Sequence, residues 1–452
     1  MVIEYLPVIR QGVDGIQSRS LPPFLYGAAE KVSTMRSRPS CLLKNVTVPG
    51  GRVTDISITD GQVSHAGAGK LADTVIDCAS LIVLPAAIDM HVHMRGGSQS
   101  LKEDWESGTR SALAGGVTVV VDQPNTVPPV TTPEAFQARL TDARARSLCH
   151  FAINSGITTD TPLQAMWEAG AMAFGEVFYA PSSYGEAVTR EELRDALDKL
   201  GHLDALATIH AEEVGPGPDT TLASHQQIRS AAGELRAVND VARANTAGCR
   251  LHFCHLSTAS SVDAARGTVE VTPHHLFLSR EIFRDDDAFG KVNPPLRSER
   301  ERRELFSRWQ RIDVIASDHA PHTVQEKEQE FSGAPSGLPG VETMVPLLLA
   351  AALEKKITLP DIIAKTSSTP AAILSIPPAG FTPGSRGDFA LYPKEAVPIE
   401  PDSLHSRCGW TPFTGQKGVF PSCVILGGAV VFDEGEFTRA CPTWIPGKGF
   451  RQ

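Results

Sequence analysis

The sequence predicts an α/β protein, in which a (β/α)8 barrel is accompanied by a small β-domain formed from both chain ends. Two observations support this prediction. Short β-rich runs alternate with amphipathic, helix-like segments between about residues 80 and 320, and eight such repeats are the count of a (β/α)8 barrel. Both flanks instead consist of short alternating runs broken by glycine. We expect the barrel over residues 85–379 and the small β-domain over residues 39–84 and 380–452.

The eight strand candidates are rich in β-branched and other apolar residues. They are residues 81–88, 117–121, 150–154, 172–175, 205–209, 250–254, 268–271 and 313–316. Helical segments such as "SLKEDWESGTRSALAGG", "TPEAFQARLTDARARS" and "TREELRDALDKLGHL" lie between them. The order strand, helix, strand predicts parallel pairing.

The flanking segments carry hairpin signals. In "VTDISITD" apolar and polar residues alternate, and the chain then turns at "DG", which is typical of antiparallel strands. Near the other end, Gly427 and Gly428 in "CVILGGAVVF" fit a tight hairpin turn. Residues 1–38 have no periodic pattern and are interpreted as a mobile extension, with Met35 as an alternative start.

Composition narrows the class of protein. The chain has 452 residues, 41% hydrophobic residues and a net charge of −10, which argues against nucleic acid or an anionic membrane as the main partner. The apolar run "MVPLLLAAAL" contains proline and is about half the length of a membrane helix. Eight cysteines without a C-x-x-C pair predict reduced thiols and a cytoplasmic location.

Polar residues follow most of the predicted strands, where a barrel of this kind places its chemistry. His91 and His93 alternate after the first strand, so they share one face and can hold one metal ion. His210, His255 and Asp318 follow later strands. Four imidazoles and a carboxylate suit Zn²⁺, so we expect a zinc site at this end of the barrel.

With these residues in place, the sequence resembles a known family. The stretches that carry the resemblance are "HVHMR", "KEDWESGTRSALAGGVTVVVDQPNT", "HFCHLST", "TPHHLFLS", "GKVNPPLR", "SDHAPHT" and "SGLPGVET". Together they resemble the dihydroorotases of the metal-dependent amidohydrolase superfamily, over about residues 40–440. The resemblance implies the barrel and β-domain described above, and the reversible cyclisation of N-carbamoyl-L-aspartate to dihydroorotate in pyrimidine synthesis.

The resemblance also assigns roles to individual residues. It implies that His91 and His93 bind one zinc ion, that His210 and His255 bind a second, and that Asp318 is both a ligand and the general acid/base. The implied substrate contacts are Arg95, Asn125 and His322 at a carboxylate, and Asn293, Pro339 and Gly340 near the pyrimidine ring.

Elementary chemistry agrees with these roles. Arginine offers two parallel N–H groups to a carboxylate, so Arg95 indicates an acidic substrate. A bound metal polarises an amide carbonyl and lowers the pKa of bound water towards about 7. Asp318 could then take the proton of that water and pass it to the departing nitrogen.

One stretch departs from the family pattern. Many relatives carry a carboxylated, metal-bridging lysine after the fourth strand. In "GAMAFGEVF", Gly170 and Phe174 fit that motif and Met172 falls at the lysine. Methionine is a poor zinc ligand, so the usual bridge is expected to be absent. Either Glu176 supplies a bridging carboxylate, or the chain holds one firmly bound zinc and a weak second one.

Two other functions stay open at this point. One is hydrolysis of another cyclic amide, as in hydantoinases, dihydropyrimidinases or allantoinases, although Arg95 and Asn125 speak against it. The other is an inactive paralogue that serves as a scaffold. The expected partner is a small-molecule substrate, and both a homo-oligomer and an aspartate transcarbamoylase partner are compatible with the resemblance.

Overall fold

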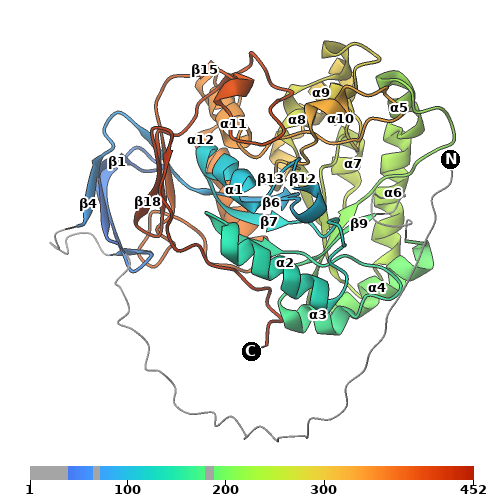
Figure 1. Ribbon diagram of the computed structural model, residues 1–452, viewed down its shortest axis with the longest axis horizontal. Coiled ribbons are helices and arrows are strands. Elements are labelled where there is room, and N and C mark those ends of the chain that lie inside the picture. The colour runs from blue at the N-terminus through green and yellow to red at the C-terminus, as the bar shows by residue number, and fades with distance from the viewer. Residues whose placement is uncertain (1–38, 65–71, 179–187, 452) are drawn as a thin grey trace, which may run out of the picture. The chain divides into compact units, whose positions relative to one another are not determined.

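The structure is a computed structural model that describes residues 39–64, 72–178 and 188–451. The expected extension of residues 1–38 lies outside these ranges. Eight parallel strands form the barrel seen in Figure 1. They are β6 (Ala87–Val92), β7 (Val117–Asp122), β8 (His150–Ile153), β9 (Phe174–Phe178), β10 (Leu206–His210), β11 (Arg250–Phe253), β12 (Thr268–Val271) and β13 (Val314–Ile315).

Two backbone bridges close the ring of strands. β6 to β8 form one parallel sheet and β9 to β13 another. Ser155 pairs with Phe174 between β8 and β9, and Val92 pairs with His319 just beyond β13. The (β/α)8 barrel predicted from the sequence is therefore confirmed.

Helices cover the outside of the barrel. They are α1 (Trp105–Ala114), α2 (Pro133–Arg146), α3 (Leu163–Ala169), α4 (Arg190–His202), α5 (Leu222–Ile228), α6 (Ala231–Ala244), α7 (Ala259–Ala264), α8 (Pro273–Phe277), α9 (Glu299–Phe306), α10 (Val324–Lys327), α11 (Met344–Leu353), α12 (Leu359–Ile363) and α13 (Thr369–Leu374). Capping explains where several begin: Asp104 caps α1, and Thr189 with Glu192 forms a capping box at α4.

The barrel interior is filled with apolar side chains at one end. Ile88, Val119, Met172 and Leu206 belong to one buried cluster, and α13 packs against it. Since that end is filled, the polar chemistry is confined to the end where the strands finish.

The predicted first strand, residues 81–88, is divided in the structure. Residues Ile82–Pro85 form β5, which pairs with β14 (Phe389–Tyr392) in a separate sheet. The chain changes sheet at Ala86, whose N–H donates to the Asp388 carbonyl, while the next N–H donates to the Gly116 carbonyl. Two different sheets therefore use one continuous apolar run.

Both chain ends contribute to two small sheets that share a core (Figure 1). The first contains β1 (Cys41–Thr47), β2 (Val53–Thr59), β3 (Gln62–Ser64) and β4 (Thr74–Asp77), in the order β3-β2-β1-β4. The second has the order β19-β18-β17-β14-β5, with β17 (Cys423–Leu426), β18 (Ala429–Asp433) and β19 (Glu436–Phe437). The turn between β17 and β18 is at Gly427 and Gly428, which both have positive φ. A further pair joins β15 (Val397–Pro398) to β16 (Lys417–Gly418).

Two segments within residues 380–452 contact the barrel. The Trp410 Nε1–H donates to the His322 carbonyl beside the barrel mouth, at 2.7 Å. Near the C-terminus, the Ile445 N–H donates to the Phe151 carbonyl of β8 and the Gly447 N–H to the Gly170 carbonyl. Residues 380–452 therefore do more than complete the small sheets: they also pack along the barrel.

All eight cysteines lie in the described residues and are free. Among the helices of the described ranges, none combines the length and the apolar character needed to cross a membrane.

Candidate active site

The open end of the barrel holds a polar cavity of about 360 Å³. It is lined by His93, Arg95, Gln99, Lys102, Asn125, Glu176, His210, Arg229, Val292, Asn293, Asp318, Ala320, His322, Pro335, Ser336 and Gly337. Most of the residues expected from the sequence to bind metal or substrate are among them.

An irregularity in β6 aims two histidines at this cavity. Ile88 and Met90 belong to the apolar cluster inside the barrel. The pairing of β6 with β7 then shifts register between Asp89 and Val92. His91, within this shift, and His93, just after it, both contact Asp318. A bulge of this kind re-aims side chains, so the inward-facing positions change from even-numbered to odd-numbered residues.

The first group of candidate ligands is His91, His93 and Asp318. The Nε2 atoms of His91 and His93 lie 3.5 and 3.1 Å from Asp318 Oδ1. All three residues are buried, and their ligand atoms lie within 4.8 Å of one another. This spacing fits a single metal ion between two imidazoles and a carboxylate.

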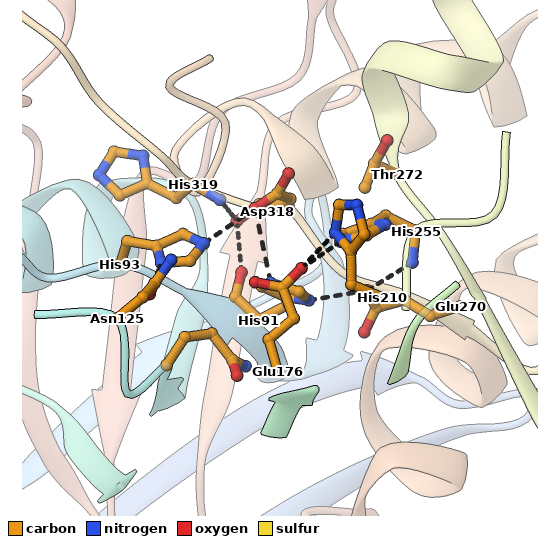
Figure 2. A network of polar contacts seen from close by, with 12 residues as sticks. His91, His93, Asn125, Glu176, His210, His255, Glu270, Thr272, Asp318 and His319 are labelled. Carbon is orange, nitrogen blue, oxygen red and sulfur yellow. Dashed lines mark hydrogen bonds and ion pairs between the residues drawn. The ribbon is translucent and has the colours of Figure 1, made fainter. Parts of the chain in front are cut away.

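The second group is arranged around Glu176, in the middle of β9 (Figure 2). Glu176 Oε1 lies 2.8 Å from His210 Nδ1 and 2.6 Å from His255 Nε2. Its other oxygen, Oε2, lies 3.6 Å from His91 Nε2. One carboxylate therefore faces both groups, with a different oxygen towards each.

Met172 lies away from this centre. It is buried in the apolar cluster inside the barrel, and its N–H donates to the Ile153 carbonyl before β9 begins. The sequence motif places Met172 at the position of the bridging lysine. In the structure, however, the residue of this stretch that lines the cavity is Glu176.

In three of the four candidate histidines, the ring nitrogen that faces away from the centre has an oxygen partner. His93 Nδ1 lies 2.6 Å from Asn125 Oδ1, His91 Nδ1 lies 3.1 Å from Glu270 Oε1, and His210 Nε2 lies 3.0 Å from Glu212 Oε2. An N–H donated to each of these oxygens leaves the inward nitrogen as a lone pair, ready to bind a metal.

Glu270 is a residue that the sequence analysis missed. Its signal was a single acid in the apolar strand "TVEV", since a buried charge requires partners. Asn125, expected at the substrate, also orients His93.

Mutual electrostatics keep the central carboxylates ionised. Burial alone would raise the pKa of Glu176, but His91, His210 and His255 hold this pKa well below its usual value. Burial likewise disfavours the charged form of His91, but Glu270 and Glu176 raise the His91 pKa well above its usual value. The carboxylates of the centre therefore attract positive charge, which the His91 proton supplies and which a bound cation would replace.

Arg95 and His322 form a positively charged part of the cavity lining. Arg95 is 7% exposed, and burial lowers its pKa to about 10, so it stays charged at neutral pH. Within the described ranges it has no ion pair with a carboxylate, and its buried Nε has no hydrogen-bond partner. His322 Nε2 lies 3.4 Å from Arg95 Nη2, and burial and the Arg95 charge lower the pKa of His322 far below its usual value. An anionic ligand would give the Arg95 guanidinium the carboxylate partner that it lacks.

Two of the expected substrate residues lie elsewhere. Pro339 and Gly340 line a separate small hollow with Glu342 and Trp410, and the Gly340 N–H donates to His319 Nδ1 at 3.1 Å. The backbone that reaches the cavity is Pro335–Gly337, three residues earlier, opposite Asn293. Pro339 and Gly340 therefore lie outside the lining of this cavity, and their expected contact with the substrate stays a prediction.

Three residues at this end have left-handed backbone conformations. The φ angles are 45° at Arg95, 33° at His255 and 46° at Asp318. Such conformations cost about 1–3 kcal/mol each for non-glycine residues and gather at functional sites.

Comparison with known proteins agrees with this geometry. A family model described as dihydro-orotase-like matches residues 80–261. The dihydroorotase of Methanosarcina acetivorans is 38% identical, over 88% of this chain and 91% of its own length. The dihydroorotase of Halobacterium salinarum is 39% identical, over 87% of this chain and 96% of its own.

Solved structures show the same fold. The L-hydantoinase of Arthrobacter aurescens superposes with a TM-score of 0.80 at 22% identity, covering 92% of this chain and 99% of its own. The dihydropyrimidinase of Brevibacillus agri gives a TM-score of 0.81 at 21% identity, covering 91% of this chain and all of its own. At such identities the likeness concerns the fold, whereas the relatives described above identify the family. The resemblance found in the sequence is confirmed, and the chain belongs to the dihydroorotase family.

Proposed function

We propose that this protein is a zinc-dependent dihydroorotase, which reversibly cyclises N-carbamoyl-L-aspartate to (S)-dihydroorotate in pyrimidine synthesis. Relatives that bear this name match most of the chain. The observation that carries the proposal is the presence, in one cavity, of a His/carboxylate centre and of the buried Arg95, which has no carboxylate partner among the described residues.

The described residues fit a metal. His91 Nε2 is buried without a hydrogen-bond partner, although it points between Asp318 and Glu176. Imidazole nitrogens and carboxylate oxygens are the donors that zinc accepts. We assign His91, His93 and Asp318 to one zinc ion and His210 and His255 to a second, with Glu176 between them.

The metal, when bound, polarises the amide carbonyl and makes water a better nucleophile. In ring opening, a C–O bond forms at the ring carbonyl and the C–N bond breaks. Asp318 is placed to accept the proton of the attacking water and to donate it to the leaving nitrogen. In ring closure the same residue takes the proton from the carbamoyl nitrogen and donates one to the departing oxygen.

The residues of the opposite wall hold the part of the substrate that does not react. Arg95 can form two parallel hydrogen bonds to the second carboxylate, and the neutral ring of His322 lies beside it. Asn293 borders the same cavity, and its buried Oδ1 has no hydrogen-bond partner among the described residues, so it can accept a hydrogen bond from a ring N–H. Arg95, Asn293 and His322 thus favour a cyclic, acidic substrate.

Location and assembly complete the proposal. Seven of the eight free cysteines are buried, which supports a reducing, cytoplasmic location. A homo-oligomer or an aspartate transcarbamoylase partner stays a prediction.

One assay tests the function. The purified full chain with added zinc should interconvert carbamoyl aspartate and dihydroorotate, and elemental analysis should find up to two zinc ions per chain. Turnover of hydantoin or allantoin alone would instead favour a different cyclic amidohydrolase. Absence of both turnover and bound metal would favour the scaffold hypothesis.

A further inference from the structure

Glu270 connects the two groups of candidate ligands from behind. It lies on β12, is 1% exposed, and accepts three hydrogen bonds. His91 Nδ1 and the His255 backbone N lie 3.1 and 3.0 Å from its Oε1. His252 Nε2 lies 3.0 Å from its Oε2. Figure 2 shows the contacts to His91 and His255.

We infer that Glu270 is a positioning residue that sets the zinc affinity of both groups at once, by orienting His91 in one and His255 in the other. This inference rests on the proposed zinc-dependent function. It names a residue outside the ligand set and makes it common to two sites.

The contact with His91 acts through the ring. A carboxylate that accepts the Nδ1–H fixes the tautomer with a lone pair on Nε2 and makes that nitrogen more basic. His91 Nε2 is the atom that faces Asp318 and Glu176. Contacts with the rings of His91 and His252, at 3.1 and 3.0 Å, hold the Glu270 carboxylate in this place.

The contact with His255 acts through the backbone. His255 has φ of 33°, which is costly for a residue with a side chain. Its N–H is held by Glu270, and its ring reaches Glu176 Oε1 from this turn. Loss of the Glu270 oxygen would leave this N–H buried without its acceptor, and the ring would lose its fixed direction.

A direct role as a metal ligand is the competing explanation. His91, Cys254 and Glu270 also lie close enough together to hold an ion. However, both oxygens of Glu270 already have partners, in the His91 ring, the His255 N–H and the His252 ring. Glu270 also faces Nδ1 of His91, on the side away from Asp318.

The test compares Glu270→Gln with wild type and with a matched control. Glutamine removes the charge, and its neutral amide oxygen is a weaker acceptor than the carboxylate for both the His91 ring and the His255 N–H. Glu342→Gln is the control, because Glu342 is also buried and accepts from a histidine ring and a backbone N–H, both of His405 at 2.8 Å. Zinc affinity is measured on the full chain by competition with a chelator, and zinc content by elemental analysis.

We expect both zinc equivalents of Glu270→Gln to bind about 10- to 100-fold more weakly than in wild type, the range found for such outer partners, and those of Glu342→Gln to be unchanged. Unchanged affinity in Glu270→Gln, or weakening of one equivalent alone, would overturn the inference. So would loss of a third equivalent that wild type holds, because Glu270 would then be a ligand.

If Glu270→Gln does not fold, Glu270→Asp replaces it under the same criteria, since it keeps the charge but draws the oxygens back from both histidines. The proposed function is tested separately by wild type, because a wild-type chain that binds no zinc would reject that function. If wild type binds zinc and Glu270→Gln binds it with the same affinity, this inference alone is rejected.

Discussion

Replacement of Arg95 is the sharpest test of the substrate assignment. Arg95→Met removes a buried charge from the cavity, whereas the Arg95 carbonyl, which accepts from Arg139 Nη1, stays in place. The side chain is 7% exposed, so water screens its interaction with a carboxylate weakly. We therefore expect the mutation to affect substrate binding with little change in the fold.

The magnitude follows from the environment. Truncating one partner of a buried, hydrogen-bonded charge pair costs about 2–5 kcal/mol, which is about 30- to 4,000-fold at 1.4 kcal/mol per factor of ten. If Arg95 holds the non-reacting carboxylate, this loss affects ground state and transition state alike. KM should then rise by this factor while kcat changes much less. Arg95→Lys keeps the charge but loses the two parallel N–H donors of the guanidinium, and we expect a smaller rise in KM of about 10-fold.

Steady-state kinetics with carbamoyl aspartate and with dihydroorotate measure these values. Lys102→Met is the matched control, because Lys102 also lines the cavity but is already paired with Glu326 at 2.8 Å. Its KM should change by only a few-fold. An Arg95→Met enzyme with a KM within about 5-fold of wild type, far below the loss expected for a buried charge pair, would refute the assignment of Arg95 to the carboxylate.

Three further predictions concern the centre and its surroundings. Glu176→Ala should lower the zinc content by about one equivalent, because one of its oxygens faces each ligand group; unchanged stoichiometry would remove it from the site. Asp318→Asn should lower kcat by about 10²- to 10⁴-fold, the usual contribution of a general acid/base. Because the equilibrium of the reaction is unchanged, kcat/KM must fall by the same factor for ring opening and ring closure. A loss of kcat below 10-fold would contradict the role of Asp318. The hydrogen bond to Glu342 raises the pKa of His405 in the folded protein, so the pair stabilises most below the unfolded pKa of about 6.5 and loses this contribution as pH rises through the folded value. His405→Ala should therefore lower the free energy of unfolding by about 1.5–3 kcal/mol at pH 6 and by less at pH 9, as measured by urea titration; a loss that grows with pH would reverse the sign.

The sequence predicted the barrel elements and the candidate ligands that meet at their ends, for a physical reason. Parallel barrel strands are buried on both faces and leave strong apolar runs, and their ends point to one side. His91, His93 and Asp318 could therefore be placed together without knowing the register of any strand. The hairpin at Gly427 and Gly428 was equally clear, because few residues other than glycine accept two consecutive positive φ angles.

The sequence could not decide between neighbouring residues where one or two residues of register determine which side chain faces the mouth. Met172 and Glu176 both fall within the predicted fourth strand and its end, yet one faces the apolar interior and the other the mouth. Pro339 and Gly340 lie in the expected loop, but the turn of the chain brings Ser336 and Gly337 to the cavity. Because side chains alternate along extended backbone, a small shift exchanges a lining residue for a packed one.

Glu270 could not be found from the sequence for a different reason. Its partners come from two other strands, β6 and the end of β11, so no spacing along the chain could have paired it with them. The left-handed turns at Arg95, His255 and Asp318 each cost about 1–3 kcal/mol, and folding must offset that cost with contacts nearby. At His255 the Glu270 carboxylate provides such a contact and orients His91 with the same oxygen. A charged residue in an otherwise apolar barrel strand is therefore a sign of an outer layer that holds the ligands, and Glu270 is where this chain should be most sensitive outside the ligands themselves.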